Sequence, residues 1–145
     1  MKFENVIVAI DQEDRTHVLV DRATDFCELV GAKLWVLHVA DPEPDFVGYD
    51  AGPEYVRLDA ALEYREDQRW VQSIAERIKG RKVDAEALLV PGYVAEVILE
   101  SADRVNADMI ICGSHRRKFF LGIFVENTAV TLSKKSERPL MIFPL

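Results

Sequence analysis

The chain has 145 residues, of which 49% are hydrophobic and 30% charged, and its formal net charge is −7. This composition fits a single globular domain over residues 1–145, with enough apolar material for a core, and excludes a disordered chain. The negative charge argues against a nucleic-acid binder, and the apolar runs are far shorter than the roughly 20 residues that span a bilayer. The first residues lack the layout of a secretory signal, so we expect a cytoplasmic protein without a membrane partner.

The first third of the chain predicts two strands around a helix. Val6–Ile10 is a β-branched run typical of a strand covered on both faces, and it ends at Asp11. A helix is expected from about Asp14 to a stop signal at Gly31. Leu34–Val39 is then predicted to be the second strand.

The middle third continues the alternation. Residues 41–53 are rich in proline and glycine and are expected to form a long loop, which in compact domains tends to be functional. The helix that follows ends near Gly80, and its apolar side carries Val56, Ala60, Tyr64, Val71, Ile74 and Ile78. Residues 83–90 alternate between apolar and acidic side chains, as an edge strand does, before a turn at Pro91-Gly92.

The last third predicts two more helices and two more strands. Apolar residues at helical spacing mark the third helix: Val94, Val97, Ile98, Ala102 and Val105. A strand over Met109–Cys112 stops at Gly113-Ser114. A last helix is expected over Ile123–Ser136, and a short strand lies between Pro139 and Pro144.

Alternating strands and helices of this length predict an α/β fold with a parallel sheet and helices on both faces. Ligands bind such sheets at the carboxyl ends of the strands, where Asp11, Val39, Gly92 and Gly113 all fall. A strand that ends in glycine and leads into a helix can present backbone N–H groups to an anion. The basic cluster Arg116–Lys118 follows directly, and it is either an anion site or a solvated loop.

Several short pieces of the chain carry a family resemblance through their order and spacing: Val8–Asp11, Leu37–Val39, Pro91–Ile98, Ala107–Ser114 and Arg138–Phe143. Together they resemble the universal stress protein family over almost the whole chain. The resemblance implies a three-layer, adenine nucleotide alpha hydrolase-like fold with a five-stranded parallel sheet of order 3-2-1-4-5. It also implies a cytoplasmic role in stress survival and a homodimer, often formed through the last strand, here Leu140, Met141, Ile142 and Phe143.

Part of that family binds ATP through G-x-x-G, nine residues, then G-S or G-T. Laid on this chain without gaps, the motif places Gly113 at its first glycine, Arg116 at its second and Glu126-Asn127 at its final pair. Glycines let the backbone approach phosphate oxygens. Glu126 would instead repel them, by about 4 kcal/mol for unit charges ~4 Å apart at an effective dielectric of ~20. ATP is therefore not expected to bind in the family manner.

A nucleotide site built differently stays open, with ATP or AMP as ligand. By the resemblance, Asp11 matches a ribose-contacting position and Val39 an adenine-contacting one, and polar groups would come from Ser114, Arg116, Asn127 and Thr128. Another interpretation makes Asp11 an acidic residue capping the turn before the first helix. A third makes the site specific for another small anion.

The remaining residues indicate no catalytic arrangement, no metal site and no required cofactor. Cys27 and Cys112 are expected to be buried, reduced thiols, and His17 and His38 have no partner in the sequence and are assigned no role. The apolar residues 119–124 are either core or a partner surface. The prediction is a non-catalytic stress-response homodimer acting through a protein partner or a small ligand, and the alternative is an adenine-nucleotide switch with at most slow hydrolysis.

Overall fold

The computed structural model describes residues 1–12, 15–42, 54–114 and 128–145. Within these residues five strands alternate with four helices: β1 (Asn5–Ile10), α1 (Thr16–Val30), β2 (Lys33–Ala40), α2 (Glu54–Lys79), β3 (Ala85–Pro91), α3 (Val94–Arg104), β4 (Met109–Ser114), α4 (Thr128–Lys135) and β5 (Leu140–Pro144). Every predicted element is present. The expected helix start at Asp14, residues 43–53 of the expected loop and the helical turn over 123–127 lie outside the described residues.

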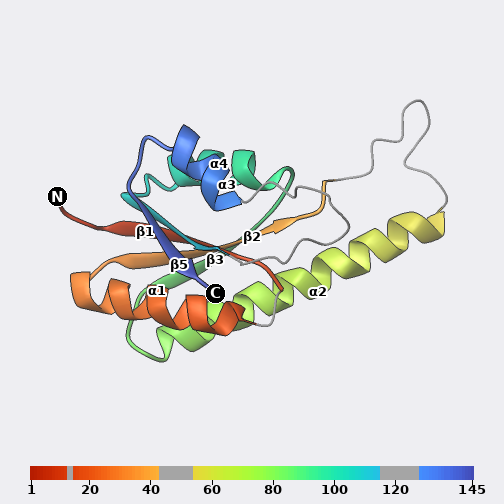
Figure 1. Ribbon diagram of the computed structural model, residues 1–145. Helices are drawn as coiled ribbons and strands as arrows, with labels where there is room; N and C mark the ends of the chain where they lie inside the picture. Colours follow the sequence, from red (N-terminus) through yellow and green to blue (C-terminus); the bar gives the residue numbers. More distant parts are fainter. Residues whose placement is uncertain (13–14, 43–53, 115–127) are drawn as a thin grey trace.

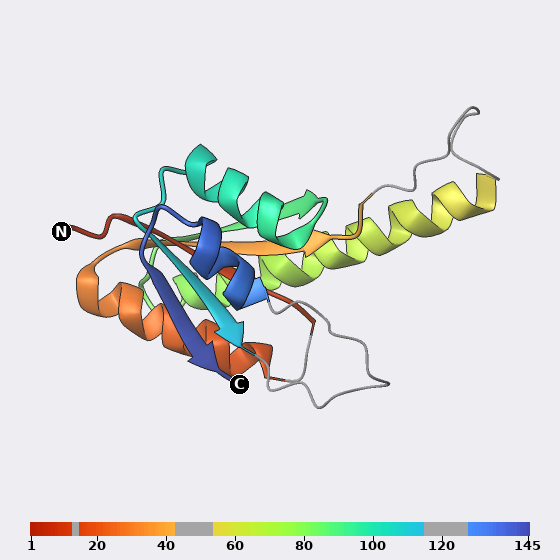
Figure 2. The ribbon, with the colours of Figure 1, turned by 45° about the horizontal axis from the view of Figure 1, so that its top comes forward.

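The five strands form one parallel sheet of order β3-β2-β1-β4-β5. This confirms the strand order that the family resemblance implied. Helices α1 and α2 cover one face of the sheet, and α3 and α4 cover the other (Figure 1). The same three layers are visible from a second direction in Figure 2.

The central strand β1 joins the two layers of the core. Val6 and Val8 are fully buried among residues of α1 and α2, whereas Ile7 is fully buried among residues of α3 and α4. Successive side chains of a strand point to opposite faces, so one β-branched run serves both cores. Each such side chain contributes about 1.5–3 kcal/mol to stability on burial.

Asp108 fixes β1 against β4 at the amino ends of the strands. Its Oδ2 accepts hydrogen bonds from the backbone N–H groups of Glu4, at 2.7 Å, and Asn5, at 2.9 Å. These two bonds hold the pKa of the Asp108 carboxyl below its usual value. The contact keeps β1 and β4 in the register that pairs Val6 with Met109.

Helix α2 departs from the sequence prediction in its first half. Val71, Ile74 and Ile78 are buried as expected, but Ala60 and Tyr64, placed on the same apolar side, are exposed. The reason is length, since a helix of 26 residues spans about 39 Å whereas the seven residues of β3 span about 23 Å. The N-terminal part of α2 therefore projects beyond the sheet (Figure 1).

Helix α3 departs from the prediction at one position. Val97, Ile98 and Ala102 are buried, but Val94, which was expected on the same core face, is 47% exposed. Val94 is the first residue of α3, directly after the turn at Gly92, and lies where the helix has only begun to approach the sheet.

The turn at Gly92 gives a test of backbone geometry. Gly92 has a φ of +143°, and a Cβ there would lie 2.7 Å from Cγ2 of buried Val97. We expect Gly92→Ala to lower the free energy of unfolding by about 2–4 kcal/mol, from strain and overpacking together. Gly31, with a φ of +71° and open space around its Cβ position, is the matched control, where alanine costs about 1–2 kcal/mol. Urea unfolding of both variants measures how much free energy of unfolding each loses. Equal losses would contradict the expectation of overpacking against Val97.

Candidate functional site

The carboxyl ends of the strands place three of the predicted site residues side by side. Ile10 pairs with His38 on β2, and Val8 pairs with Ile111 on β4. Asp11 and Val39 follow directly after the last β1–β2 pair, whereas Asp11 and Ser114 lie three residues beyond the last β1–β4 pair. Val39, Asp11 and Ser114 therefore stand at the carboxyl ends of three neighbouring strands, β2, β1 and β4. We call this the Asp11 row.

The two outer members of the Asp11 row face the same layer of helices. Val39 packs against the core of α3 and α4. Cys112 belongs to that core too, so Ser114, two residues later on β4, points to the same side. Thr128 is half-buried at the first position of α4, which lies in that layer. The structure thus places Val39, Ser114 and Thr128 on the α3/α4 side of the carboxyl edge.

Asp11 itself is half-buried and belongs to the turn before α1. The Thr16 hydroxyl donates to the main-chain carbonyl of Asp11 and, at 3.2 Å, to its Oδ1. Arg15, the residue at the N-cap of α1, makes no side-chain capping bond, so Thr16 holds this turn instead. The contact gives Asp11 a structural role next to the site, and the ribose-binding interpretation remains a separate prediction.

Gly113 has a packing role that the sequence did not indicate. It lies within β4 and has an ordinary strand conformation, and the side chain of Leu145 occupies the place that a Cβ would need, with Leu19 Cδ2 at 3.6 Å from that position. The backbone of Leu145 also donates to the Ser114 carbonyl at 3.0 Å. A Cβ at the one glycine that matches the ATP motif would thus meet the end of a flexible side chain that can turn aside, so this contact does not by itself require glycine.

A polar network ties the loop after β1 to α2. Gln12 donates to Asp67 Oδ1 at 2.6 Å, and the other carboxylate oxygen of Asp67 lies 3.8 Å from His38 Nε2. The His38 Nδ1 lies 3.1 Å from the Ile10 carbonyl oxygen, and the imidazole packs edge-on against Trp70 at 5.1 Å. Sequence patterns do not reveal these contacts, because they join residues 28 to 55 positions apart. Only the place of His38 at the end of a strand pointed to this edge.

The rest of the predicted site lies outside the described residues. This applies to Arg116, Glu126 and Asn127, to the basic cluster and to the apolar residues 119–124. Across the described ranges, no three His, Cys, Asp or Glu side chains gather in a way that would hold a metal ion. None of the helices in those ranges has the length and apolar character needed to cross a membrane.

Comparison with known proteins identifies the family. A model of the universal stress protein family matches residues 2–144. The chain belongs to the universal stress protein family. Among curated relatives, universal stress protein A homolog 1 of Coxiella burnetii is 27% identical over 116 residues, which is 79% of this chain and 78% of the relative.

Two solved structures of universal stress proteins share the fold of this family member. One, crystallised in complex with cAMP, has a TM-score of 0.69 and 20% identity, and the match covers 99% of this chain and 98% of the other. The other, from Archaeoglobus fulgidus in complex with dAMP, has a TM-score of 0.63 and 17% identity over 98% of each chain. At these identities the likeness shows the fold and leaves the ligand of this chain to its own residues.

The cysteines of this universal stress protein give a test of the core beside the site. Burial raises the pKa of the Cys27 thiol to about 12 and that of Cys112 to about 11. The reactive thiolate is then about a thousandth or less of each thiol at pH 8. We expect iodoacetamide to leave the folded protein unmodified and to alkylate both cysteines in denaturant, as read by intact mass. Rapid modification of Cys112 in the folded state would show that β4 opens to solvent at its carboxyl end.

Proposed function

We propose that this universal stress protein is a non-catalytic, cytoplasmic stress-response homodimer that acts through a protein partner or a small ligand. It does not hold ATP by the glycine loop of its nucleotide-binding relatives. The loss of two of the three motif glycines is the observation that carries this proposal, because Arg116 stands at the second glycine and Glu126-Asn127 at the final pair.

The charge pattern supports the same conclusion. The motif positions that receive phosphate in the ATP-binding relatives hold Arg116 and Glu126 in this sequence. A Glu126 carboxylate ~4 Å from a phosphate would repel it by about 4 kcal/mol at an effective dielectric of ~20.

A second candidate function is an adenine-nucleotide switch with at most slow hydrolysis. The Asp11 row favours it, because a carboxylate beside a strand end suits the hydroxyl groups of a ribose. The cAMP and dAMP complexes of two structural neighbours point the same way. In this version Ser114, Arg116, Asn127 and Thr128 replace the glycines as hydrogen-bond donors.

Calorimetric titration separates the two functions. ATP, ADP and AMP are titrated with and without Mg²⁺ into the wild-type protein and into Asp11→Ala, with Asp84→Ala, an exposed residue at the opposite end of the sheet, as the matched control. The leading proposal expects no binding at micromolar concentrations. Micromolar binding that Asp11→Ala abolishes and Asp84→Ala preserves would overturn it in favour of the switch. Mass spectrometry of co-purified material would reveal a different small anion.

The homodimer is proposed to form through the free edge of β5. The backbone N–H of Leu145 bonds to β4 at Ser114, and the Pro139 carbonyl accepts from Ile110. In a parallel ladder every second residue of a strand bonds to a given neighbour. Because Pro139 and Leu145 bond to β4, the backbone groups of Leu140, Ile142 and Pro144 point away from β4. Leu140 and Ile142 supply N–H donors and Pro144 only a carbonyl, so two antiparallel copies of β5 can exchange a short ladder.

The side chains of β5 show which residue would carry the interface. Met141 and Phe143 pack towards the α1 core, where the Arg22 guanidinium lies 5.4 Å from the Phe143 ring, and Leu140 packs towards α3 and α4. Ile142 is the most exposed large side chain of the strand at 40%. Pairing of two copies would cover it and remove an edge that otherwise invites aggregation.

We expect Ile142→Lys to convert the dimer to a monomer, because two lysines would meet across the two-fold axis. Light scattering coupled to size exclusion measures the mass over a range of concentrations. Val130→Lys, at a residue that is 45% exposed on α4, is the matched control and should leave the dimer intact. A dimer of unchanged mass in Ile142→Lys would place the interface elsewhere.

A further inference from the structure

Within the described residues, the sheet has a second edge without a neighbouring strand, along β3. Leu34 donates to the Asp84 carbonyl, and Gly92 donates to the Ala40 carbonyl. These two bonds lie at opposite ends of the β2–β3 ladder. Because every second residue of a strand bonds to a given parallel neighbour, they show which residues of β3 bond to β2. The even-numbered residues of β3 therefore bond to β2, and the backbone groups of Ala85, Ala87, Leu89 and Pro91 point outwards.

The outward side of β3 suits the addition of another strand over most of its length. Ala85, Ala87 and Leu89 each direct an N–H and a carbonyl away from the sheet, and the two alanines bring little side-chain bulk to the edge. Pro91 ends this run, since it has no N–H to donate and sits at an outward position, where an edge strand tolerates proline. Before its proline, the β3 edge offers three outward positions with both an N–H and a carbonyl, whereas the β5 edge offers two.

Tyr64 closes this edge at its third position. Its hydroxyl donates to the Leu89 carbonyl at 3.3 Å. Because that carbonyl points away from β2, the hydroxyl must lie on the outer side of β3, where an added strand would run about 4.8 Å from β3. The tyrosine and an incoming strand compete for the same carbonyl and the same space.

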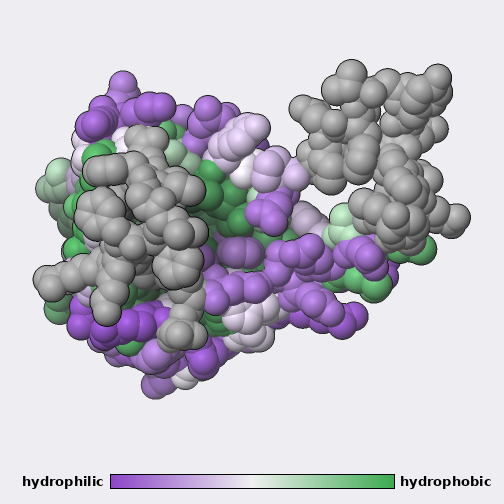
Figure 3. Space-filling model, turned by 45° about the vertical axis from the view of Figure 1, so that its right-hand side comes forward, coloured by the Kyte–Doolittle hydropathy of each residue, from purple (hydrophilic) through white to green (hydrophobic). Residues whose placement is uncertain are grey.

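The projecting part of α2 explains how a helix on the face of the sheet reaches its edge. Tyr64 comes two turns before Val71, the first fully buried residue of the helix, and is itself 40% exposed. Green, hydrophobic surface marks the projecting end of α2 in Figure 3, and exposed Leu58 and Leu62 lie on this part of the helix. Tyr64 belongs to this part of α2 and reaches the carboxyl half of β3 at Leu89.

We propose that the β3 edge is a strand-acceptor site for a second copy of this chain, and that Tyr64 keeps it closed. Association is then confined to the β5 edge and stops at a dimer. When Tyr64 is removed, each dimer gains two open edges, and pairing of β3 with β3 of another dimer extends the assembly without closure. The proposal depends on the proposed β5 dimer in one respect only, which is the number of copies in the wild-type particle.

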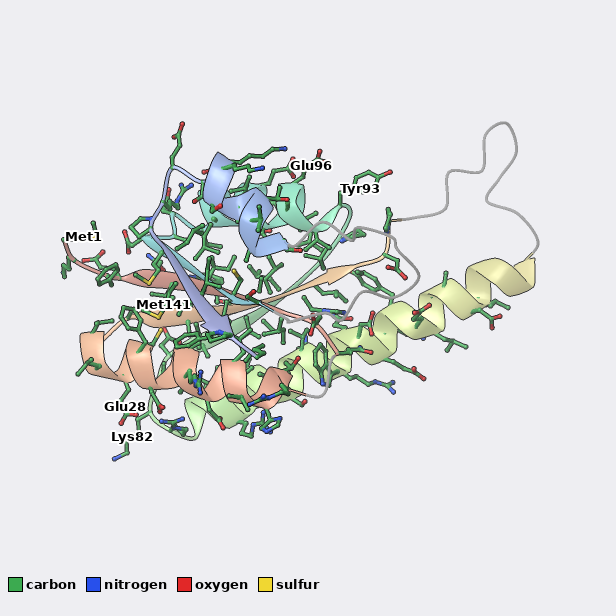
Figure 4. All side chains as sticks on the ribbon, viewed as in Figure 1. Met1, Glu28, Lys82, Tyr93, Glu96 and Met141 are labelled. Atoms are coloured by element: carbon green, nitrogen blue, oxygen red, sulfur yellow. The ribbon has the colours of Figure 1, made fainter. Side chains whose placement is uncertain are left out.

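The test is the mass of Tyr64→Ala against that of the wild-type protein, by light scattering over a concentration series. We expect the variant to reach about twofold the wild-type mass or more as concentration rises. Tyr64→Phe, which keeps the ring and loses the hydroxyl, should show a smaller increase. Tyr93→Ala removes a tyrosine that is 71% exposed before α3 (Figure 4), and this control should match the wild-type protein.

A rescue variant distinguishes an opened edge from a destabilised fold. Ala87→Pro removes an outward N–H from the middle of the edge, and together with Tyr64→Ala it should restore the wild-type mass. Wild-type mass in Tyr64→Ala with an unchanged circular dichroism spectrum, or a raised mass that Ala87→Pro does not reduce, would overturn the proposal. If the β5 dimer itself is wrong, the wild-type protein is a monomer and Tyr64→Ala becomes a dimer, so the two failures give different masses.

Discussion

The register of the parallel sheet is the constraint on which the rest of this structure depends. β1 is buried on both faces and sets the positions of β2 and β4, and Asp108 fixes its start against β4. That register determines where Asp11 lies relative to Val39 and Ser114. It also determines which backbone groups point outwards at the two edges of the sheet. The candidate site and the proposed dimer edge are thus both defined by one set of strand pairings.

The two edges of the sheet are alike in backbone chemistry and differ in what covers them. Each ends in a proline at an outward position, Pro91 on β3 and Pro144 on β5. The difference lies in the helices, because α2 is long enough to place Tyr64 at β3, whereas the Ile142 side chain of β5 stays exposed. Open sheet edges invite strand pairing between copies, so unequal coverage is what the proposed β5 dimer would need in order to stop at two copies.

Much of the fold could be predicted from the sequence, because β-branched runs, helical spacing and glycine stops such as Gly31 are local signals. The strand order came only from the family resemblance, since hydrophobic patterns do not state which strands are neighbours. The exposure of Tyr64 could not be predicted, because its spacing is that of a core residue and only the length of β3 removes the core beneath it. The role of Gly113 was hidden for a similar reason, as the side chain that fills its space lies 32 residues later in the chain.

Gly113 also bears on how a degenerate binding motif is interpreted. A glycine shared with nucleotide-binding relatives is weak evidence for phosphate contact when the other glycines of the motif are missing, and at Gly113 a Cβ would meet only the movable end of the Leu145 side chain. At the described part of the edge, the Asp11 carboxylate accepts from Thr16, so it already has a structural role. Arg116 and Glu126, the side chains that replace motif glycines, therefore argue against an ATP loop in this chain, whereas Asp11 does not, since by the resemblance it stands at a ribose-contacting position.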